Sequence, residues 1–116
     1  MKRILIVEDE ITISRLIAVS LRRAGYDCTV ANDGSTAADL IAEHDFDLAL
    51  LDPPFHHDTV AAVLPLLAAK MAPGGVVLCE TEREADLPEQ AGSLTLVKQY
   101  NYGKIKVSRY ERGEEV

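Results

Sequence analysis

The sequence lacks any apolar run long enough to cross a membrane or to form a secretory leader, because the first apolar segment gives way to acids at Glu8. Cysteine is scarce as well. Cys28 and Cys79 each lie in a strand-like segment, where a free thiol behaves as a small buried apolar residue. We therefore expect a cytoplasmic protein with reduced thiols and no membrane contact.

The chain also lacks the residue patterns of several enzyme classes. It has no Ser/His/Asp arrangement, no P-loop and no zinc-ligand spacing. Positive charge is in deficit, with 12 Lys and Arg against 19 Asp and Glu and a net charge of −7. Since an acidic protein repels a phosphate backbone, we expect no binding to nucleic acid unless a local basic patch forms. We also expect a monomer.

Strand-like and helix-like segments alternate along the 116 residues, which fits one compact domain. This alternation predicts an α/β fold, a three-layer, doubly wound, mostly parallel sheet. The expected strands are 3–7, 26–31, 46–51 and 76–80, with helices at 12–25, 33–44 and 58–71 between them. The chain then ends in a β-hairpin around an Asn/Gly turn, so we predict the strand order 2-1-3-4-6-5 with strand 6 antiparallel.

The first half of the chain, residues 1–52, resembles a response-regulator receiver domain. The likeness rests on "RILIVEDE", "LRRAGYDCTVANDGSTAADLI" and "FDLALLD". It implies that Glu8 and Asp9 hold a divalent cation and that Asp52 accepts a phosphoryl group.

The second half, residues 46–112, resembles class I methyltransferases instead, most closely those that methylate a guanine amino group in 16S ribosomal RNA. "DLALLDPPF", "MAPGGVVLCE", "DLPEQAG" and "YNYGKIKVSRYER" carry this likeness. It implies that a motif of four residues holds and stacks the target base: Asp52, Pro53, Pro54 and Phe55.

The two resemblances overlap only in the third strand, whose buried run and terminal acid suit both families. We therefore interpret the chain as a chimera, an engineered or recombined scaffold with a flavodoxin-like/Rossmann-like hybrid fold and no complete active site. Two alternatives stay open: a phosphoryl-accepting receiver of two-component signalling, and a fragment of a ribosomal RNA methyltransferase.

The receiver chemistry predicts an acidic pocket at the carboxyl edge of the sheet. Glu8, Asp9 and Asp52 would converge there and bind Mg²⁺ weakly, because the cation relieves their mutual repulsion. Phosphorylation of Asp52 by a histidine kinase or a small phosphodonor would also need a hydroxyl and a lysine. Since the Lys-Pro pair of the family is absent, the auxiliary candidates are Thr81, Lys104 and Lys106.

The methyltransferase chemistry is missing its cofactor loop. That family binds S-adenosylmethionine (SAM) on a glycine-rich loop after the first strand, whereas this chain has "VEDEITI" there, with three acids and no glycine. Asn32 or Asp33 could stand in for the ribose-binding acid after the second strand. On this ground we expect neither SAM binding nor enzymatic activity.

Overall fold

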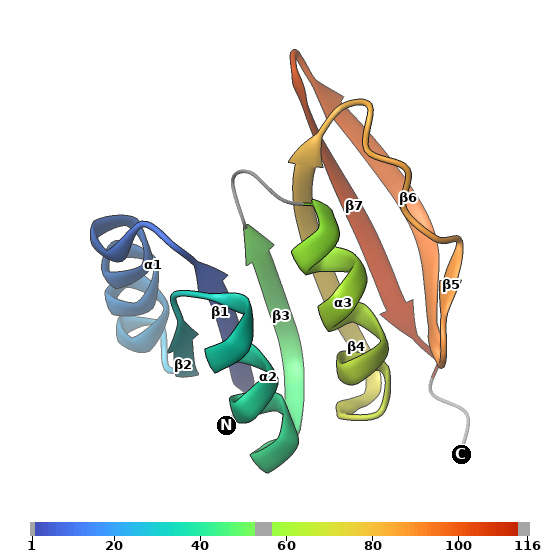
Figure 1. Cartoon of the computed structure of the whole chain (residues 1–116). Helices are drawn as coiled ribbons and strands as arrows, with labels where there is room; N and C mark the ends of the chain where they lie inside the picture. The colour runs from blue at the N-terminus through green and yellow to red at the C-terminus, as the bar shows by residue number, and fades with distance from the viewer. Residues whose placement is uncertain (1, 53–56, 114–116) are drawn as a thin grey trace.

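A computed structural model gives the structure of the chain and describes residues 2–52 and 57–113 (Figure 1). The elements are β1 (Arg3–Glu8), α1 (Ile11–Arg23), β2 (Asp27–Ala31), α2 (Gly34–Glu43), β3 (Phe46–Asp52), α3 (His57–Ala68), β4 (Met71–Glu82), β5 (Gln90–Ala91), β6 (Leu94–Tyr102) and β7 (Ile105–Arg112). No helix in this described part is long and apolar enough to cross a membrane.

The strands form one mixed sheet in the order β2-β1-β3-β4-β7-β6-β5. β2, β1, β3 and β4 pair in parallel, whereas β4–β7, β7–β6 and β6–β5 pair antiparallel. The predicted α/β class is confirmed, but the predicted strand order differs in detail. The two-residue strand β5 at the edge was not foreseen, because its pairing with β6 depends on a polar loop without strand periodicity.

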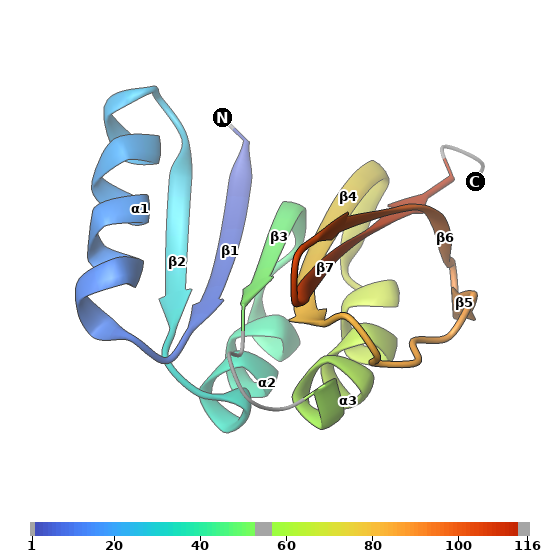
Figure 2. The same ribbon diagram turned by 90° about the horizontal axis from the view of Figure 1, so that it is seen from above.

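Helices cover the two faces of the sheet unequally (Figure 2). α2 and α3 lie on one face over the larger core, which draws on both halves of the chain, from Leu5 and Phe46 to Leu64 and Tyr110. α1 lies on the other face over a smaller core around Ile4 and Ile6. One continuous core joins the two halves, so the packing shows no boundary at the third strand, where we expected a splice.

Local sequence explains where the helices begin and end. Asp33 caps α2, since its side chain accepts a hydrogen bond from the Thr36 backbone N–H at 2.6 Å. α1 ends before Gly25, whose φ of +97° suits a residue without a Cβ. α3 continues across Pro65, an exposed position.

β4 begins earlier than the sequence pattern indicates. It starts at Met71 rather than near residue 76, and its pairing with β3 shifts register between Phe46 and Leu48. Gly75 lies in this stretch, where an added Cβ would stand 2.8 Å from the carbonyl oxygen of Ala72. The segment 73–75 therefore forms part of an irregular start of β4, and the close backbone packing there needs the glycine at position 75.

Candidate functional site

Three acids lie in a row where neighbouring strands end at the carboxyl edge of the sheet. Glu8 at the end of β1 is in register with Asp52 at the end of β3. Asp52 in turn interacts with the side chain of Glu80 in β4, since Leu51 pairs with Cys79 one position earlier. We call Glu8, Asp52 and Glu80 the carboxyl-edge acids.

Burial and crowding shift the proton affinity of two of these acids. Burial raises the pKa of Glu8 from 4.5 to about 7, against a hydrogen bond from the Glu10 backbone that lowers it, and Asp52 raises it further. Burial likewise raises the pKa of Asp52 to about 6, with Glu80 adding to the rise. The site therefore holds carboxyl groups that exchange protons near neutral pH.

The turn after β1 is tied to the end of β2 by side-chain hydrogen bonds. The Asn32 amide donates to the Glu8 carbonyl oxygen at 2.7 Å and to the Ser14 hydroxyl at 3.1 Å. The Glu8 carboxylate accepts from the Glu10 backbone N–H at 3.0 Å. These contacts hold Glu8 in place, and Glu8 is only 3% exposed to solvent.

The structure separates the other predicted site residues. Asp9 is exposed beside Glu8, whose pKa it raises. Thr81 follows Glu80 in β4 and so faces the opposite side of the sheet, where its hydroxyl donates to the Glu82 carbonyl oxygen. Lys106 pairs with Thr81 and donates to the Ala85 carbonyl oxygen, away from the acids.

Lys104 lies in the turn between β6 and β7 and is exposed. Within residues 2–52 and 57–113, no group of three or more His, Cys, Asp or Glu is arranged to hold a metal ion. The predicted Mg²⁺ site of Glu8, Asp9 and Asp52 stays a prediction, with Glu8 and Asp52 in register and Asp9 beside them. The motif residues Pro53, Pro54 and Phe55 lie outside the described residues.

Glu80 is the site residue that sequence reasoning missed. It ends the apolar run "VVLCE", and strand alternation puts it on the face opposite Cys79. An acid at that position, next to a strand that ends in Asp52, was the available signal. Its use required knowing that β3 and β4 are neighbours in register.

The described part of the chain thus forms a mostly parallel α/β sheet that is finished by antiparallel strands, with the carboxyl-edge acids at the ends of its parallel strands. The chain belongs to the family Conserved hypothetical protein 95, whose family model matches residues 1–111.

Solved structures share this fold over nearly the whole chain. A "conserved hypothetical protein" of Streptococcus pyogenes is 25% identical, with a TM-score of 0.72 over 96% of this chain and 86% of its own. A "Putative methyltransferase" of Escherichia coli is 18% identical, with a TM-score of 0.69 over 98% of this chain and 78% of its own. The Thermus thermophilus 16S rRNA N2 G1207 methyltransferase, solved with AdoMet and guanosine, is 18% identical, with a TM-score of 0.60 over 96% and 37%.

These comparisons correct the sequence-based interpretation. The chain is not a chimera of a receiver and a methyltransferase, since one family model spans both halves and the junction. The interpretations of the chain as an engineered scaffold and as a signalling receiver are wrong for the same reason. The expectations of no enzyme and no SAM are also contradicted, because the fold neighbours include methyltransferases and one of them binds AdoMet.

Proposed function

We propose that the chain is a SAM-dependent methyltransferase that acts on an exocyclic amino group of a nucleobase in RNA, with guanine as the first candidate. The family match across residues 1–111 and the methyltransferases that share the fold support the class. The guanosine complex of a protein with this fold suggests the substrate. The observation that carries the proposal is Asp52, a half-buried acid that ends β3 beside Glu8.

Asp52 has the chemistry to orient an amino group and to receive its proton. A carboxylate accepts a hydrogen bond from the N–H, which turns the nitrogen lone pair toward the incoming methyl group. Methylation leaves the nitrogen with a proton to lose. The pKa of Asp52 is raised to about 6 and that of Glu8 to about 7, so this pair can take up the proton near neutral pH.

The residues at the carboxyl edge fit one part of SAM and not another. SAM supplies the methyl group when bound, and its positive charge suits the carboxylates of Glu8 and Asp52. The turn after β1 has no glycine, and the Glu10 backbone N–H already bonds to Glu8. The amide of Asn32 and the carboxylate of Asp33 also have partners within the protein, so a ribose would have to share them.

Transfer of a radioactive methyl group from SAM to guanosine and to short RNA oligonucleotides tests the proposal. We expect wild-type protein to label the RNA and Asp52→Asn to lose about 100-fold or more of that activity, as is typical when a positioned acid or base is removed. Asp45→Asn, an exposed acid at the opposite end of β3, should keep wild-type activity. A folded wild-type protein that neither binds SAM in calorimetry nor transfers a methyl group would overturn the proposal.

The cytoplasm is the compartment that we propose for this activity. Cys28 and Cys79 are buried free thiols, which suits a reducing environment. Fractionation of intact cells followed by immunodetection of the protein would check this, and recovery outside the cytoplasmic fraction would contradict it.

A further inference from the structure

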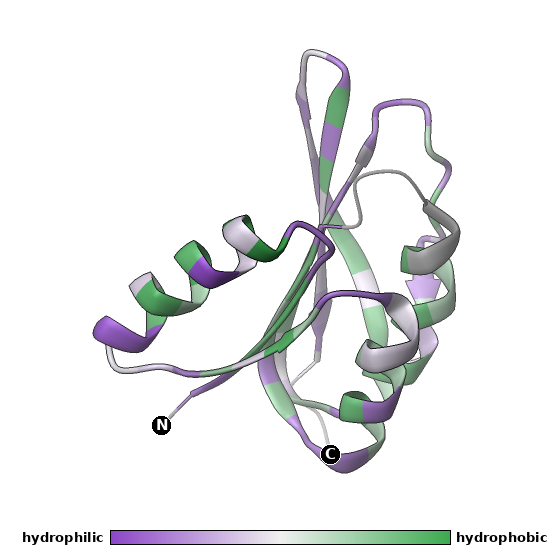
Figure 3. Cartoon of the chain, turned by 60° about the vertical axis from the view of Figure 1, so that its left-hand side comes forward, coloured by the Kyte–Doolittle hydropathy of each residue, from purple (hydrophilic) through white to green (hydrophobic). Residues whose placement is uncertain are grey.

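Among residues 2–52 and 57–113, no helix lies over β4, β7 and β6 on one face of the sheet. α1 packs on this face over β1 and β2, and α2 and α3 lie on the other face (Figures 2 and 3). The loop between β4 and β5 contributes Ala85 and Leu87 as buried residues, and Leu87 belongs to the core under α3. Within the described part of the chain, no helix therefore covers the strand surface beside the carboxyl-edge acids.

Strand registers place a defined set of side chains on this open face. Glu80 pairs with Val107, and Val107 pairs with Tyr100 on the outer strand. One step further toward the hairpin turn, Ile105 pairs with Tyr102. Because directly opposed residues share a face, an apolar and aromatic surface lies beside the carboxyl-edge acids on the neighbouring strands β7 and β6. We call it the hairpin platform, made of Lys98, Tyr100, Tyr102, Ile105 and Val107.

The two tyrosines of the hairpin platform form a flat, accessible stack. Their ring centroids are 6.4 Å apart and the ring planes differ by 15°. Tyr102 is 59% exposed and Ile105 is 38% exposed, so the sheet itself does not need these groups for its core. Exposed aromatic rings on a sheet surface are the groups on which bases of single-stranded nucleic acid stack.

Positive charge accompanies the rings. The Lys98 ammonium lies 5.1 Å from the centroid of the Tyr100 ring. Residues 94–112 hold five basic residues and one acid, a net charge of +4 within a chain of net charge −7. Lys106 and Arg109 already have protein partners, so Lys98 and the exposed Lys104 are the cations best placed for phosphates. Lys98 beside the rings and Lys104 in the hairpin turn therefore form the small local basic patch to which RNA phosphates can bind.

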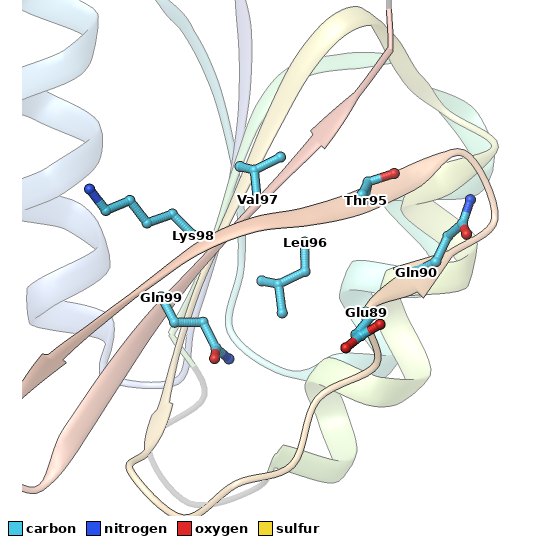
Figure 4. A pocket seen from close by; sticks show the side chains of 7 residues that line it. All are labelled: Glu89, Gln90, Thr95, Leu96, Val97, Lys98 and Gln99. Atoms are coloured by element: carbon cyan, nitrogen blue, oxygen red, sulfur yellow. The ribbon is translucent and has the colours of Figure 1, made fainter.

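The outer edge of β6 adds a polar groove of about 470 Å³ next to Lys98. Figure 4 shows Lys98 and Gln99 leaving the strand on opposite sides, with Gln90 and Thr95 farther along the groove. Amide and hydroxyl groups of this kind can hydrogen-bond to base edges and sugars. Glu89 also lines the groove, so the groove extends the hairpin platform along the strand with mostly polar groups and one acid.

We propose that the hairpin platform binds single-stranded RNA next to the target nucleotide, with bases stacked on Tyr100 and Tyr102 and phosphates near Lys98 and Lys104. This inference rests on the proposed function, because it adds the substrate contacts of the same site. Tyr100 stands three strands from Asp52, about 14 Å at about 4.8 Å per strand. A nucleotide held at Asp52 and its neighbours on the platform can therefore belong to one RNA strand.

Fluorescence anisotropy with a labelled single-stranded RNA 12-mer tests the platform. We expect Tyr102→Ala to weaken RNA binding about 5- to 100-fold, the range for loss of one stacked base, and Tyr102→Phe to retain it. Tyr26→Ala is the matched control, since Tyr26 is a 40% exposed tyrosine far from the hairpin, at the start of β2. Lys98→Ala should lower the slope of log affinity against log salt by about 1.

The results separate this inference from the proposed function. RNA binding by wild type that Tyr102→Ala weakens, without any methyl transfer, would refute the enzyme and leave the platform standing. Equal RNA affinity of wild type and Tyr102→Ala, or no RNA binding by folded wild type, overturns the platform. A mass that doubles with concentration in light scattering and returns to monomer in Tyr102→Ala also overturns it, because a second copy then covers the face.

Discussion

Replacing Glu8 by glutamine should stabilise the protein above neutral pH and change little in acid. The pKa of Glu8 lies at about 7 in the folded protein, above its ordinary value of 4.5. The stability that comes from the protonated carboxyl is fully present below pH 4.5 and is lost as the pH rises through 7. Glutamine remains neutral throughout, and its side-chain oxygen can still accept from the Glu10 N–H.

The size of this effect follows from the pKa difference. At about 1.4 kcal/mol per pH unit the rise from 4.5 to about 7 corresponds to about 3 kcal/mol as an upper limit. Asp52 shares the proton with Glu8, so we expect less than this limit, about 1–2 kcal/mol at pH 8. The free energy of unfolding of Glu8→Gln should exceed that of wild type by this amount.

Urea unfolding at pH 4, 5, 6, 7 and 8 measures the difference between the two proteins. Glu10→Gln is the control, because Glu10 is exposed and its replacement removes the same formal charge two residues away from Glu8. The difference between Glu8→Gln and wild type should grow from pH 4 to pH 8, while the control shows no such trend. A wild type more stable than Glu8→Gln at pH 8 would refute the argument that burial disfavours the Glu8 carboxylate.

Three further predictions test the packing around the site and the sheet. Asn32→Ala should cost about 1–2 kcal/mol in urea unfolding, since it removes the bonds to the Glu8 carbonyl and the Ser14 hydroxyl; an unchanged value would mean that water replaces the amide. Gly92→Ala should destabilise more than Gly103→Ala, because both have positive φ but only at Gly92 would the new Cβ meet another atom, the Ala68 Cβ at 2.8 Å; equal melting temperatures would contradict this. Tyr110→Phe should cost about 1 kcal/mol, because the buried hydroxyl donates to the Pro88 carbonyl oxygen; a more stable variant would show that the bond contributes nothing.

The identification of the family shows where local patterns mislead. "FDLALLD" is a buried parallel strand that ends in an acid, and this physical requirement is common to many α/β sheets. The same seven residues therefore resembled two families and suggested a splice between them. The single family match and the continuous core from Leu5 to Tyr110 remove the need for one.

Sequence alone determined the alternation of strands and helices, the acids at the ends of β1 and β3, and the terminal hairpin, because periodicity, caps and turn residues act over a few neighbouring positions. Only the tertiary structure decided which of those groups meet. Pairing of β3 with β4 brought Glu80 to Asp52, and antiparallel pairing of β4 with β7 put Lys106 on the far face. Pairing of β7 with β6 then put Tyr100 on the near face. Strand alternation specifies that side chains take opposite faces, but neighbours and register arise from contacts between residues distant in the chain.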